Sequence, residues 1–306
     1  MKIKEIYNQG INIQKYFRDK NKVLENDINS ILYSYDYQAG SYIKQYYDET
    51  IIEGLYILDG KKVNMTYRQF QELFGLYVAQ ELNALHPSNV LEVGTGEATS
   101  ICDIILNMDK KIKFSGLELS LSRLLYASKF AYYKKVDVNF VLGDMFHMPY
   151  SDNAFDVVLM MHCLESNTGR EKEALEELLR VTRKYIVLLE PSYELGNEET
   201  RNRIKDLCYI NNLKNTIEEL NLDVVKNELF KVTTYNNNTG ITIIKKGEKY
   251  KNMGMDTGFV CPYCRTVLHR HEEAYFCPEC FNLYPVIRNI PILNINHAIL
   301  CSKYEK

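Results

Sequence analysis

Residues 89–100 constrain the fold of this chain more than any other stretch. They read Asn-Val-Leu-Glu-Val-Gly-Thr-Gly-Glu-Ala-Thr-Ser, and the apolar run at 90–93 predicts a short buried strand. The strand leads directly into a turn with Gly94 and Gly96, where the absence of a Cβ atom lets the backbone bend sharply. A helix with an apolar face is predicted to follow. This order is typical of a nucleotide site, although an ordinary strand-to-helix corner has a similar pattern.

The glycine turn differs from a dinucleotide fingerprint. That fingerprint requires Gly-x-Gly-x-x-Gly, whereas this chain has Gly94-x-Gly96-x-Ala98, with Glu92 two positions before the first glycine. The pattern Glu/Asp-x-Gly-x-Gly-x-Gly/Ala resembles the first motif of class I S-adenosylmethionine-dependent methyltransferases. In that family the acidic residue contacts the methionine end of the cofactor, and the glycines let the backbone approach it. The resemblance therefore implies that Glu92, Gly94 and Gly96 bind S-adenosylmethionine.

Three further segments follow in the order and at the spacing of that family. Residues 113–118 predict a strand that ends in Glu118, and a carboxylate at this point can accept the hydroxyl groups of a ribose. The next predicted strand ends at Asp144 and Met145, which resemble the family's adenine clamp. Residues 148–161 resemble the segment that leads into the family's fourth strand. The alternatives are a nicotinamide enzyme and a degenerate fold that no longer binds a cofactor.

The chain before the first motif is expected to be helical and to cover the sheet or form a lid. Residues 1–30 mix charged and apolar residues at helical spacing, which predicts one or two amphipathic helices. Residues 31–42 resemble the pattern Y-D-x-x-A-x-x-Y of many small-molecule methyltransferases, in which a tyrosine closes over the cofactor. The resemblance implies this role for Tyr37 and Tyr42. Packing beneath the first helices is the alternative for both.

The other predicted elements complete an α/β unit. Residues 55–85 are expected to be mainly helical after Gly60, with a capped start at Thr66. The elements expected after the second and fourth strands are a crossover helix over 119–134, a helix over 170–182, a fifth strand over 185–191, a helix over 198–220 and a hairpin of 230–235 with 240–245. With the resemblance, they imply the Rossmann-like, seven-stranded α/β sheet of the methyltransferase family.

Candidate catalytic residues follow the fourth and fifth strands. Methyl transfer is a displacement at an activated sulfonium, so the protein mainly aligns the acceptor and excludes water. His162 lies just past the fourth strand, and its neutral imidazole can take a proton from an acceptor. The alternative for His162 is a hydrogen bond at a strand end. His147 and Glu190 are secondary candidates, and Glu190 either binds substrate or caps a helix.

The cysteines point to a metal site near the C-terminal end of this sequence. Four of the eight form two Cys-x-x-Cys pairs, namely Cys261 with Cys264 and Cys277 with Cys280. This spacing can place four thiolates around one tetrahedral Zn²⁺, and such a closed site is structural. Free cysteines and redox pairs are the alternatives. Residues 283–293 resemble the small zinc-ribbon proteins that activate tRNA, rRNA and release-factor methyltransferases by docking on them. The resemblance implies an internal cap or stabiliser, with RNA binding as the alternative.

These observations divide the chain into four parts. They are an N-terminal helical region or lid (1–85), a methyltransferase domain (86–246), a linker (247–258) and a zinc ribbon (259–298). The 306 residues suffice for one α/β domain and a smaller unit. A formal net charge of −3 argues against a broad electropositive surface for nucleic acid. The chain has no apolar run of membrane-spanning length and no signal-peptide core at its start, so we expect a cytoplasmic protein without membrane contacts.

We therefore expect an S-adenosylmethionine-dependent methyltransferase that acts on an oxygen or nitrogen of a small metabolite or glycan precursor. Its expected cofactors are S-adenosylmethionine and a structural Zn²⁺. A tRNA or rRNA methyltransferase that uses the ribbon for docking is one alternative, and a non-catalytic cofactor-binding subunit is another. The sequence leaves open the identity of the acceptor and whether the chain forms a homo-oligomer.

Overall fold

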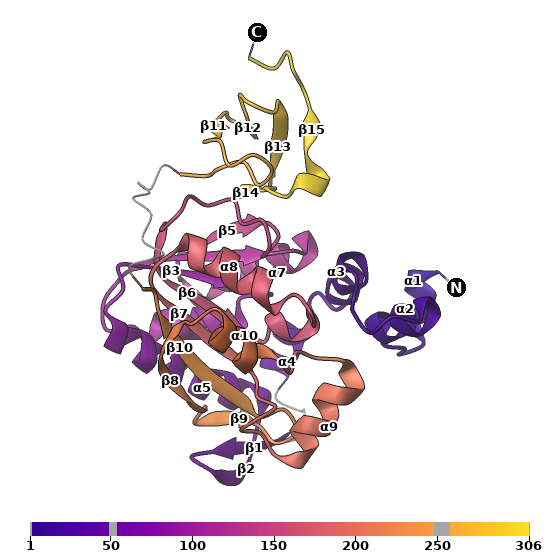
Figure 1. Ribbon diagram of the computed structural model, residues 1–306, viewed down its shortest axis with the longest axis vertical. Coiled ribbons are helices and arrows are strands. Elements are labelled where there is room, and N and C mark those ends of the chain that lie inside the picture. The colour runs from indigo at the N-terminus through magenta and orange to yellow at the C-terminus, as the bar shows by residue number, and fades with distance from the viewer. Residues whose placement is uncertain (1, 49–53, 248–257, 306) are drawn as a thin grey trace.

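The computed structural model describes residues 2–48, 54–247 and 258–305 and has a seven-stranded sheet at its centre (Figure 1). The strand order is β5-β4-β3-β6-β7-β10-β8. The strands from β5 to β7 in this order are parallel, and β10 runs antiparallel to β7 and β8. The strands are β3 (Asn89–Val93), β4 (Lys113–Glu118), β5 (Asn139–Leu142), β6 (Phe155–Met161), β7 (Thr182–Pro191), β8 (Asp223–Leu229) and β10 (Thr239–Lys245). The predicted α/β fold is confirmed.

Helices cover both faces of this sheet, as parallel strands require. They are α5 (Tyr67–Leu85), α6 (Thr99–Leu106), α7 (Leu121–Lys134), α8 (Glu171–Val181) and α10 (Leu213–Glu219). A further helix, α9 (Glu198–Leu207), follows β7 along the chain. Successive strand residues point to opposite faces. Val90 therefore joins the core beneath α5, α6 and α7, whereas Leu91 joins the core beneath α8 and α10. The predicted cap of α5 is also confirmed, because Thr66 and Gln69 form a reciprocal capping box.

Two sequence expectations for the second half of the chain are wrong. The single helix expected over 198–220 is interrupted, because Cys208 ends α9 in a left-handed conformation with φ of 53°. The hairpin expected from 230–235 and 240–245 does not form. Strand β10 pairs instead with β8, an edge strand whose side chains are mostly exposed. Such a strand lacks the apolar pattern from which it can be predicted.

A small second sheet was also absent from the expectations. Strands β1 (Gly54–Leu58) and β2 (Lys61–Met65) form a hairpin, and β9 (Val232–Thr234) pairs with β1. The expectation of helix directly after Gly60 is therefore wrong for residues 61–65. Strand β1 also pairs with β9, which is remote in sequence, and such a pairing cannot be predicted from the local sequence.

Four short helices precede this sheet. They are α1 (Ile3–Asn8), α2 (Ile13–Asn21), α3 (Ile28–Tyr37) and α4 (Ser41–Tyr47). Helices α3 and α4 pack against α5, α6 and α7 near the carboxyl ends of the parallel strands. The side-chain amide of Asn26 donates to the Ser166 carbonyl at 2.8 Å, which fixes the connection between α2 and α3. The helical expectation for residues 1–30 is confirmed.

The last part of the chain is a small β unit that docks on the edge of the main sheet. Its strands are β11 (His269–Arg270), β12 (Ala274–Phe276), β13 (Asn282–Ile287), β14 (Ile290–Pro291) and β15 (Ile299–Leu300). Ile292 forms a parallel bridge with Leu142 of β5, and the Leu293 N–H donates to the Leu142 carbonyl at 2.8 Å. The unit therefore covers the open edge of β5 (Figure 1). Most of the predicted linker 247–258 lies outside the described residues.

Among the described residues, none of the helices has the length and apolar character needed to span a bilayer.

We expect Leu293→Ala to lower the free energy of unfolding by about 2–5 kcal/mol, the usual cost of truncating a fully buried leucine. Leu293 is fully buried between the β unit and the core of the main sheet. The matched control is Ile299→Ala, because Ile299 belongs to the same unit and is 55% exposed. Urea denaturation of both variants tests the docking, and equal stabilities would contradict it.

Candidate active site

A cavity of about 580 Å³ lies at the carboxyl ends of the parallel strands. Its size is within the usual range for small-molecule sites, and open α/β sheets bind ligands at this edge. The cavity is lined by residues from the N-terminal helices, from the strand ends β3 to β6, from α9 and from the β9–β10 region. The predicted site residues in its walls are Tyr42, Glu92, Gly94, Gly96, Glu118, Asp144, Met145 and His162.

The glycine turn forms the floor of this cavity. Gly94 and Gly96 have φ of 76° and 58°, in the left-handed region that favours glycine. The N–H groups of Gly94 and Thr95 both donate to the Leu117 carbonyl, at 2.8 and 3.0 Å. A Cβ atom on Gly94 would collide with the side chain of Cys163. The two glycines are therefore needed for the turn and for its close packing.

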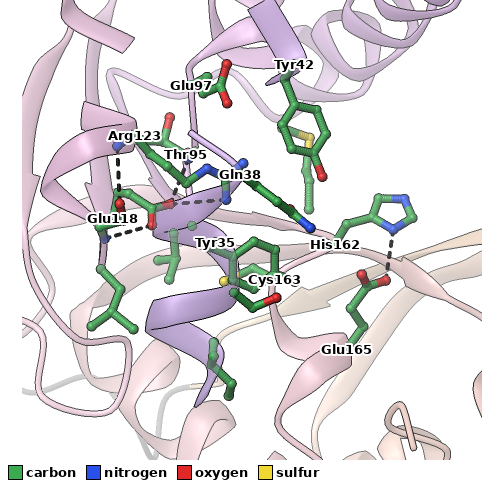
Figure 2. A pocket seen from close by; sticks show the side chains of 18 of the residues that line it. Tyr35, Gln38, Tyr42, Thr95, Glu97, Glu118, Arg123, His162, Cys163 and Glu165 are labelled. Carbon is green, nitrogen blue, oxygen red and sulfur yellow. Dashed lines mark hydrogen bonds and ion pairs between the residues drawn. The ribbon is translucent and has the colours of Figure 1, made fainter. Parts of the chain in front are cut away.

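Glu118 is held by the turn that follows β3. Its Oε2 accepts the Gly96 N–H at 2.9 Å, and its Oε1 accepts the Ser120 N–H at 3.0 Å. The Arg123 guanidinium lies 3.9 Å from the same carboxylate (Figure 2). Each carboxylate oxygen can accept more than one hydrogen bond, so Glu118 retains acceptor capacity toward the cavity.

Glu92 and Asp144 are the other acidic residues at this edge. Glu92 is almost fully buried, and its Oε2 accepts the Thr95 hydroxyl at 2.5 Å. Burial raises the pKa of Glu92 to about 7. Asp144 accepts the Phe146 N–H at 3.0 Å, and burial raises its pKa as well. Glu92, Glu118 and Asp144 thus stand at the ends of three adjacent strands around one cavity.

The N-terminal segment places Tyr42 in the cavity but not Tyr37. The Tyr37 ring lies on Tyr7, with 5.4 Å between the ring centroids, and Tyr37 is 37% exposed. Tyr35 lines the cavity instead. Residues two positions apart on a helix point to different sides, so only one of the two can face the sheet. Tyr35 is also the tyrosine that directly precedes Asp36 in the Y-D-x-x-A-x-x-Y pattern, a signal that could have identified it.

Three residues beyond those predicted fasten the N-terminal segment to the cofactor-side loops. Both oxygens of Glu97 accept backbone N–H groups at the start of α4, each at 2.9 Å. The Ser120 hydroxyl donates to Asp36 at 2.6 Å. Arg123 lies 5.1 Å from the centroids of both the Tyr35 and the Tyr42 rings, as cation–π contacts require (Figure 2). Their positions inside or beside the motifs are the only sequence signal for them.

His162 lies directly after β6 in a polar network. Its Nδ1 is 3.2 Å from Glu165 Oε2 (Figure 2). Its Nε2 is 2.9 Å from Thr239 Oγ1. Burial lowers the pKa of His162, but the hydrogen bond and charge of Glu165 outweigh it, so the pKa is raised. In the neutral ring Nδ1 donates to Glu165, which leaves Nε2 as an acceptor toward Thr239. Two candidates do not line the cavity: His147 and Glu190.

Glu190 caps the turn that carries the His162 network. It accepts the N–H groups of Cys163, Leu164 and Glu165 at 3.0, 2.9 and 3.2 Å. These groups open the short helix η1 (Leu164–Ser166). Burial raises the pKa of Glu190 to about 7. This geometry matches the helix cap that was one of the two roles expected for Glu190. The carboxylate of Glu190 fixes the position of η1.

Comparisons with known proteins point to the same class of domain as the sequence motifs. Residues 90–185 match a family model described as a methyltransferase domain. The chain contains a methyltransferase domain. Ajmaline N-methyltransferase of Rauvolfia serpentina is 34% identical over 97 residues, which are 31% of this chain and 32% of that protein. The chain therefore spans about a third of the length of this curated relative.

Two solved structures share the fold of the methyltransferase domain. The [4+2]-cyclase SpnF superimposes with a TM-score of 0.55 and 15% identity, over 72% of this chain and 97% of that chain. Magnesium protoporphyrin IX methyltransferase (ChlM) of Synechocystis PCC 6803, solved with bound SAH, gives a TM-score of 0.53 and 10% identity, over 72% and 100%. At these identities the likeness concerns the fold.

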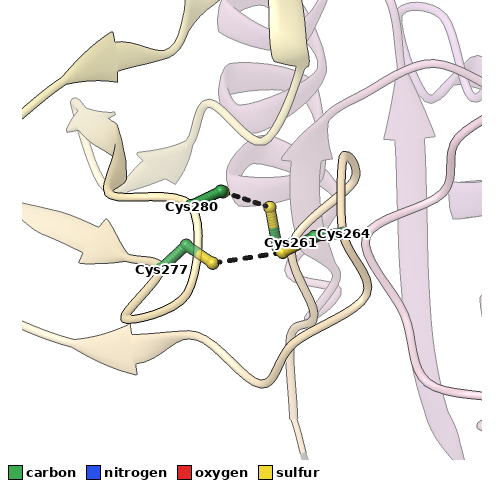
Figure 3. A group of neighbouring side chains, drawn as sticks. All are labelled: Cys261, Cys264, Cys277 and Cys280. Carbon is green, nitrogen blue, oxygen red and sulfur yellow. Dashed lines mark hydrogen bonds between the residues drawn. The ribbon is translucent and has the colours of Figure 1, made fainter.

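The four predicted zinc ligands meet in the β unit that docks on the methyltransferase domain (Figure 3). The sulfur atoms of Cys261, Cys264, Cys277 and Cys280 all lie within 4.8 Å of one another, and two pairs are 3.6 and 3.4 Å apart. Tetrahedral Zn²⁺ with four thiolates has sulfur–sulfur separations of about 3.8 Å, so the cluster fits this ion. His269 and His271 instead contact the Glu305 carboxylate.

We expect Cys261→Ser to lower the zinc content and the thermal stability together, because a zinc site supplies folding free energy to a unit of this size. The control is Cys301→Ser, since Cys301 belongs to the same unit but lies outside the four-sulfur cluster. Elemental analysis and thermal unfolding of both variants test the assignment. A zinc-free Cys261→Ser protein with unchanged stability would contradict a structural metal.

Proposed function

We propose that the protein is an S-adenosylmethionine-dependent methyltransferase that acts on an oxygen or nitrogen of a small metabolite or glycan precursor. The observation that carries the proposal is that Glu92, Glu118 and Asp144 line one cavity together with the glycine turn. All of these residues lie within residues 90–185, which match a methyltransferase domain. The name of the N-methyltransferase relative supports the same reaction class. The fold alone does not, because SpnF is described as a cyclase.

The residues around the cavity fit this cofactor. Gly94 and Gly96 allow close backbone approach, and Glu118 has acceptor capacity for the ribose hydroxyls. Asp144 can accept the adenine amine beside the Met145 backbone, and Glu92 suits the methionine end. Tyr42, with Tyr35 in place of Tyr37, covers the site. When bound, S-adenosylmethionine supplies an electrophilic methyl group on a sulfonium.

His162 would act as the base when the acceptor must lose a proton. Glu165 accepts the Nδ1 proton and so keeps Nε2 free of one. The Thr239 hydroxyl lies 2.9 Å from Nε2 of His162, and both residues line the cavity. An acceptor hydroxyl or amine beside Thr239 can therefore release its proton to Nε2 through this hydroxyl, as methyl transfer proceeds. The tyrosine-rich roof over the cavity excludes water.

The division into a helical region (1–85), a methyltransferase domain (86–246), a linker (247–258) and a zinc ribbon (259–298) is part of the proposal. The contact of Ile292 and Leu293 with Leu142 supports an internal stabilising role for the ribbon, because residues 143–145 follow directly and line the adenine side. Arg265, one of the few basic residues of the ribbon, is bound to Glu177 at 3.0 Å. This pairing counts against RNA docking through Arg265.

Transfer of labelled methyl from S-adenosylmethionine into a cell extract tests the function. We expect label in the small-molecule fraction, and about a tenfold or larger reduction with Asp144→Ala, which loses an acceptor for the adenine amine. Asp137→Ala is the control, since Asp137 is exposed and does not line the cavity. Label confined to RNA would overturn the small-molecule acceptor. Cofactor binding without transfer to any fraction would indicate a non-catalytic subunit.

The pH dependence of transfer tests the role of His162. A base must be neutral, so the rate should rise with pH through a pKa above the ordinary value of about 6.5. Glu165→Gln removes the charge that raises this pKa and leaves the burial that lowers it. We therefore expect the inflection to move to lower pH, by on the order of one unit. Glu173→Gln, on the surface of α8, is the control, and an unchanged profile in Glu165→Gln would exclude His162 as the base.

A further inference from the structure

Arg203 is a cation that lines the same cavity as His162 and forms no ion pair among the described residues. It lies on α9 with Leu207 one turn later, and both side chains face the cavity. Among the described residues no carboxylate forms an ion pair with Arg203, and its buried Nε has no hydrogen-bond partner. The other arginine of the cavity, Arg123, differs because it has Glu118 at 3.9 Å.

Glu165, which also lines this cavity, is already engaged. Glu165 accepts a hydrogen bond from His162, and burial and the charge of Glu165 together raise the pKa of Tyr209. His162, Tyr42 and Tyr209 line the same cavity as Arg203, and its charge lowers the pKa of all three. Burial raises the pKa of both tyrosines, so they are neutral hydroxyl groups at pH 7. None of these groups neutralises the guanidinium.

A partly desolvated cation without a partner is costly in the free protein and becomes favourable when a ligand supplies the opposite charge. The planar guanidinium donates two parallel hydrogen bonds to a carboxylate or a phosphate, which makes arginine the usual choice for such groups. Tyr42 and Tyr209 add hydroxyl donors to the lining of the same cavity. The position of Arg203 near His162 places the anion close to the group that loses its proton.

We propose that Arg203 binds an anionic group, a carboxylate or a phosphate, of the small molecule that accepts the methyl group. The inference rests on the proposed function and specifies its substrate class. Arg203 and the Thr239–His162 pair are separate groups in the cavity lining, so the anionic group bound by Arg203 is distinct from the atom that loses its proton beside Thr239 and is methylated. The methylated product therefore keeps its negative charge.

The charge of the labelled product tests this inference. The small-molecule fraction labelled by the full-length protein is passed over an anion exchanger at neutral pH, before and after phosphatase treatment. Retention of the label supports the inference, and loss of retention after phosphatase identifies a phosphate rather than a carboxylate. Labelled product, distinct from unreacted S-adenosylmethionine, in the unretained fraction before treatment overturns the inference and leaves methyl transfer itself intact, and so does label only in RNA. No label in any fraction overturns the proposed function and the inference together.

Variants of Arg203 provide a second test on the purified acidic acceptor. Arg203→Gln should raise KM about 10- to 100-fold, the loss expected for a charge-assisted hydrogen-bonded pair, and Arg203→Lys should recover part of it. Arg201→Gln is the matched control, because Arg201 lies on the same helix and donates to the Gly196 carbonyl outside the cavity. Equal KM values for Arg203→Gln and Arg201→Gln would overturn the inference.

A pH profile separates a binding role from a purely structural one. The charge of Arg203 lowers the pKa of His162. Arg203→Gln should therefore move the inflection of the rate to higher pH, opposite to the shift expected for Glu165→Gln. Loss of activity with an unshifted inflection and an unchanged KM would mean that Arg203 acts only in folding, and would overturn the inference.

Discussion

The hydrogen bonds between the glycine turn and the end of β4 are the constraint on which the rest of the site depends. The Leu117 carbonyl accepts two N–H groups of the turn, and the Glu118 carboxylate accepts a third, from Gly96. These bonds fix where α6 begins and orient Glu118 before any ligand is bound. Glu97, in the same turn, holds the start of α4. One short loop thus positions the floor of the cavity, its ribose-side carboxylate and its roof.

At the edge of the sheet the buried carboxylate of Glu177 likewise holds several segments together. Glu177 on α8 accepts the Met148 N–H at 2.7 Å and binds both Arg180 and Arg265. A buried charge of this kind is tolerated only when its oxygens are fully satisfied. The three donors come from the loop before β6, from α8 and from the C-terminal β unit. Glu177 therefore joins this unit to the main sheet through polar contacts, while Leu293 joins it through apolar ones.

The sequence predicted those parts of the fold and site that depend on local chemistry. Buried parallel strands such as β3 and β6 are apolar runs, so they could be predicted. The spacing of the four cysteines was enough to predict that their sulfur atoms lie together. Strand β8 was not predicted because its side chains are mostly exposed and it is held in place by pairing with β10. Tyr37 was named from the sequence but does not line the cavity, whereas Tyr35 does, because the direction of a helix face depends on what it packs against. The role of Glu97 depends on tertiary contacts with α4, and the place of Arg203 in the cavity lining depends on the packing of α9, so neither could be predicted from the sequence.

The charges in the cavity are arranged so that its two ends suit ligands of opposite sign. At the strand ends the acidic groups Glu92, Glu118 and Asp144 favour a cationic ligand, and a positive charge nearby also favours the ionised form of Glu92, whose pKa of about 7 leaves it partly protonated at neutral pH. At the α9 end the guanidinium of Arg203 adds a positive charge, while the carboxylate of Glu165 is hydrogen-bonded to His162. A sulfonium and an anionic acceptor would each be drawn to the matching end. The methyl group would then lie between them, beside His162, because electrostatics orients both partners before they react.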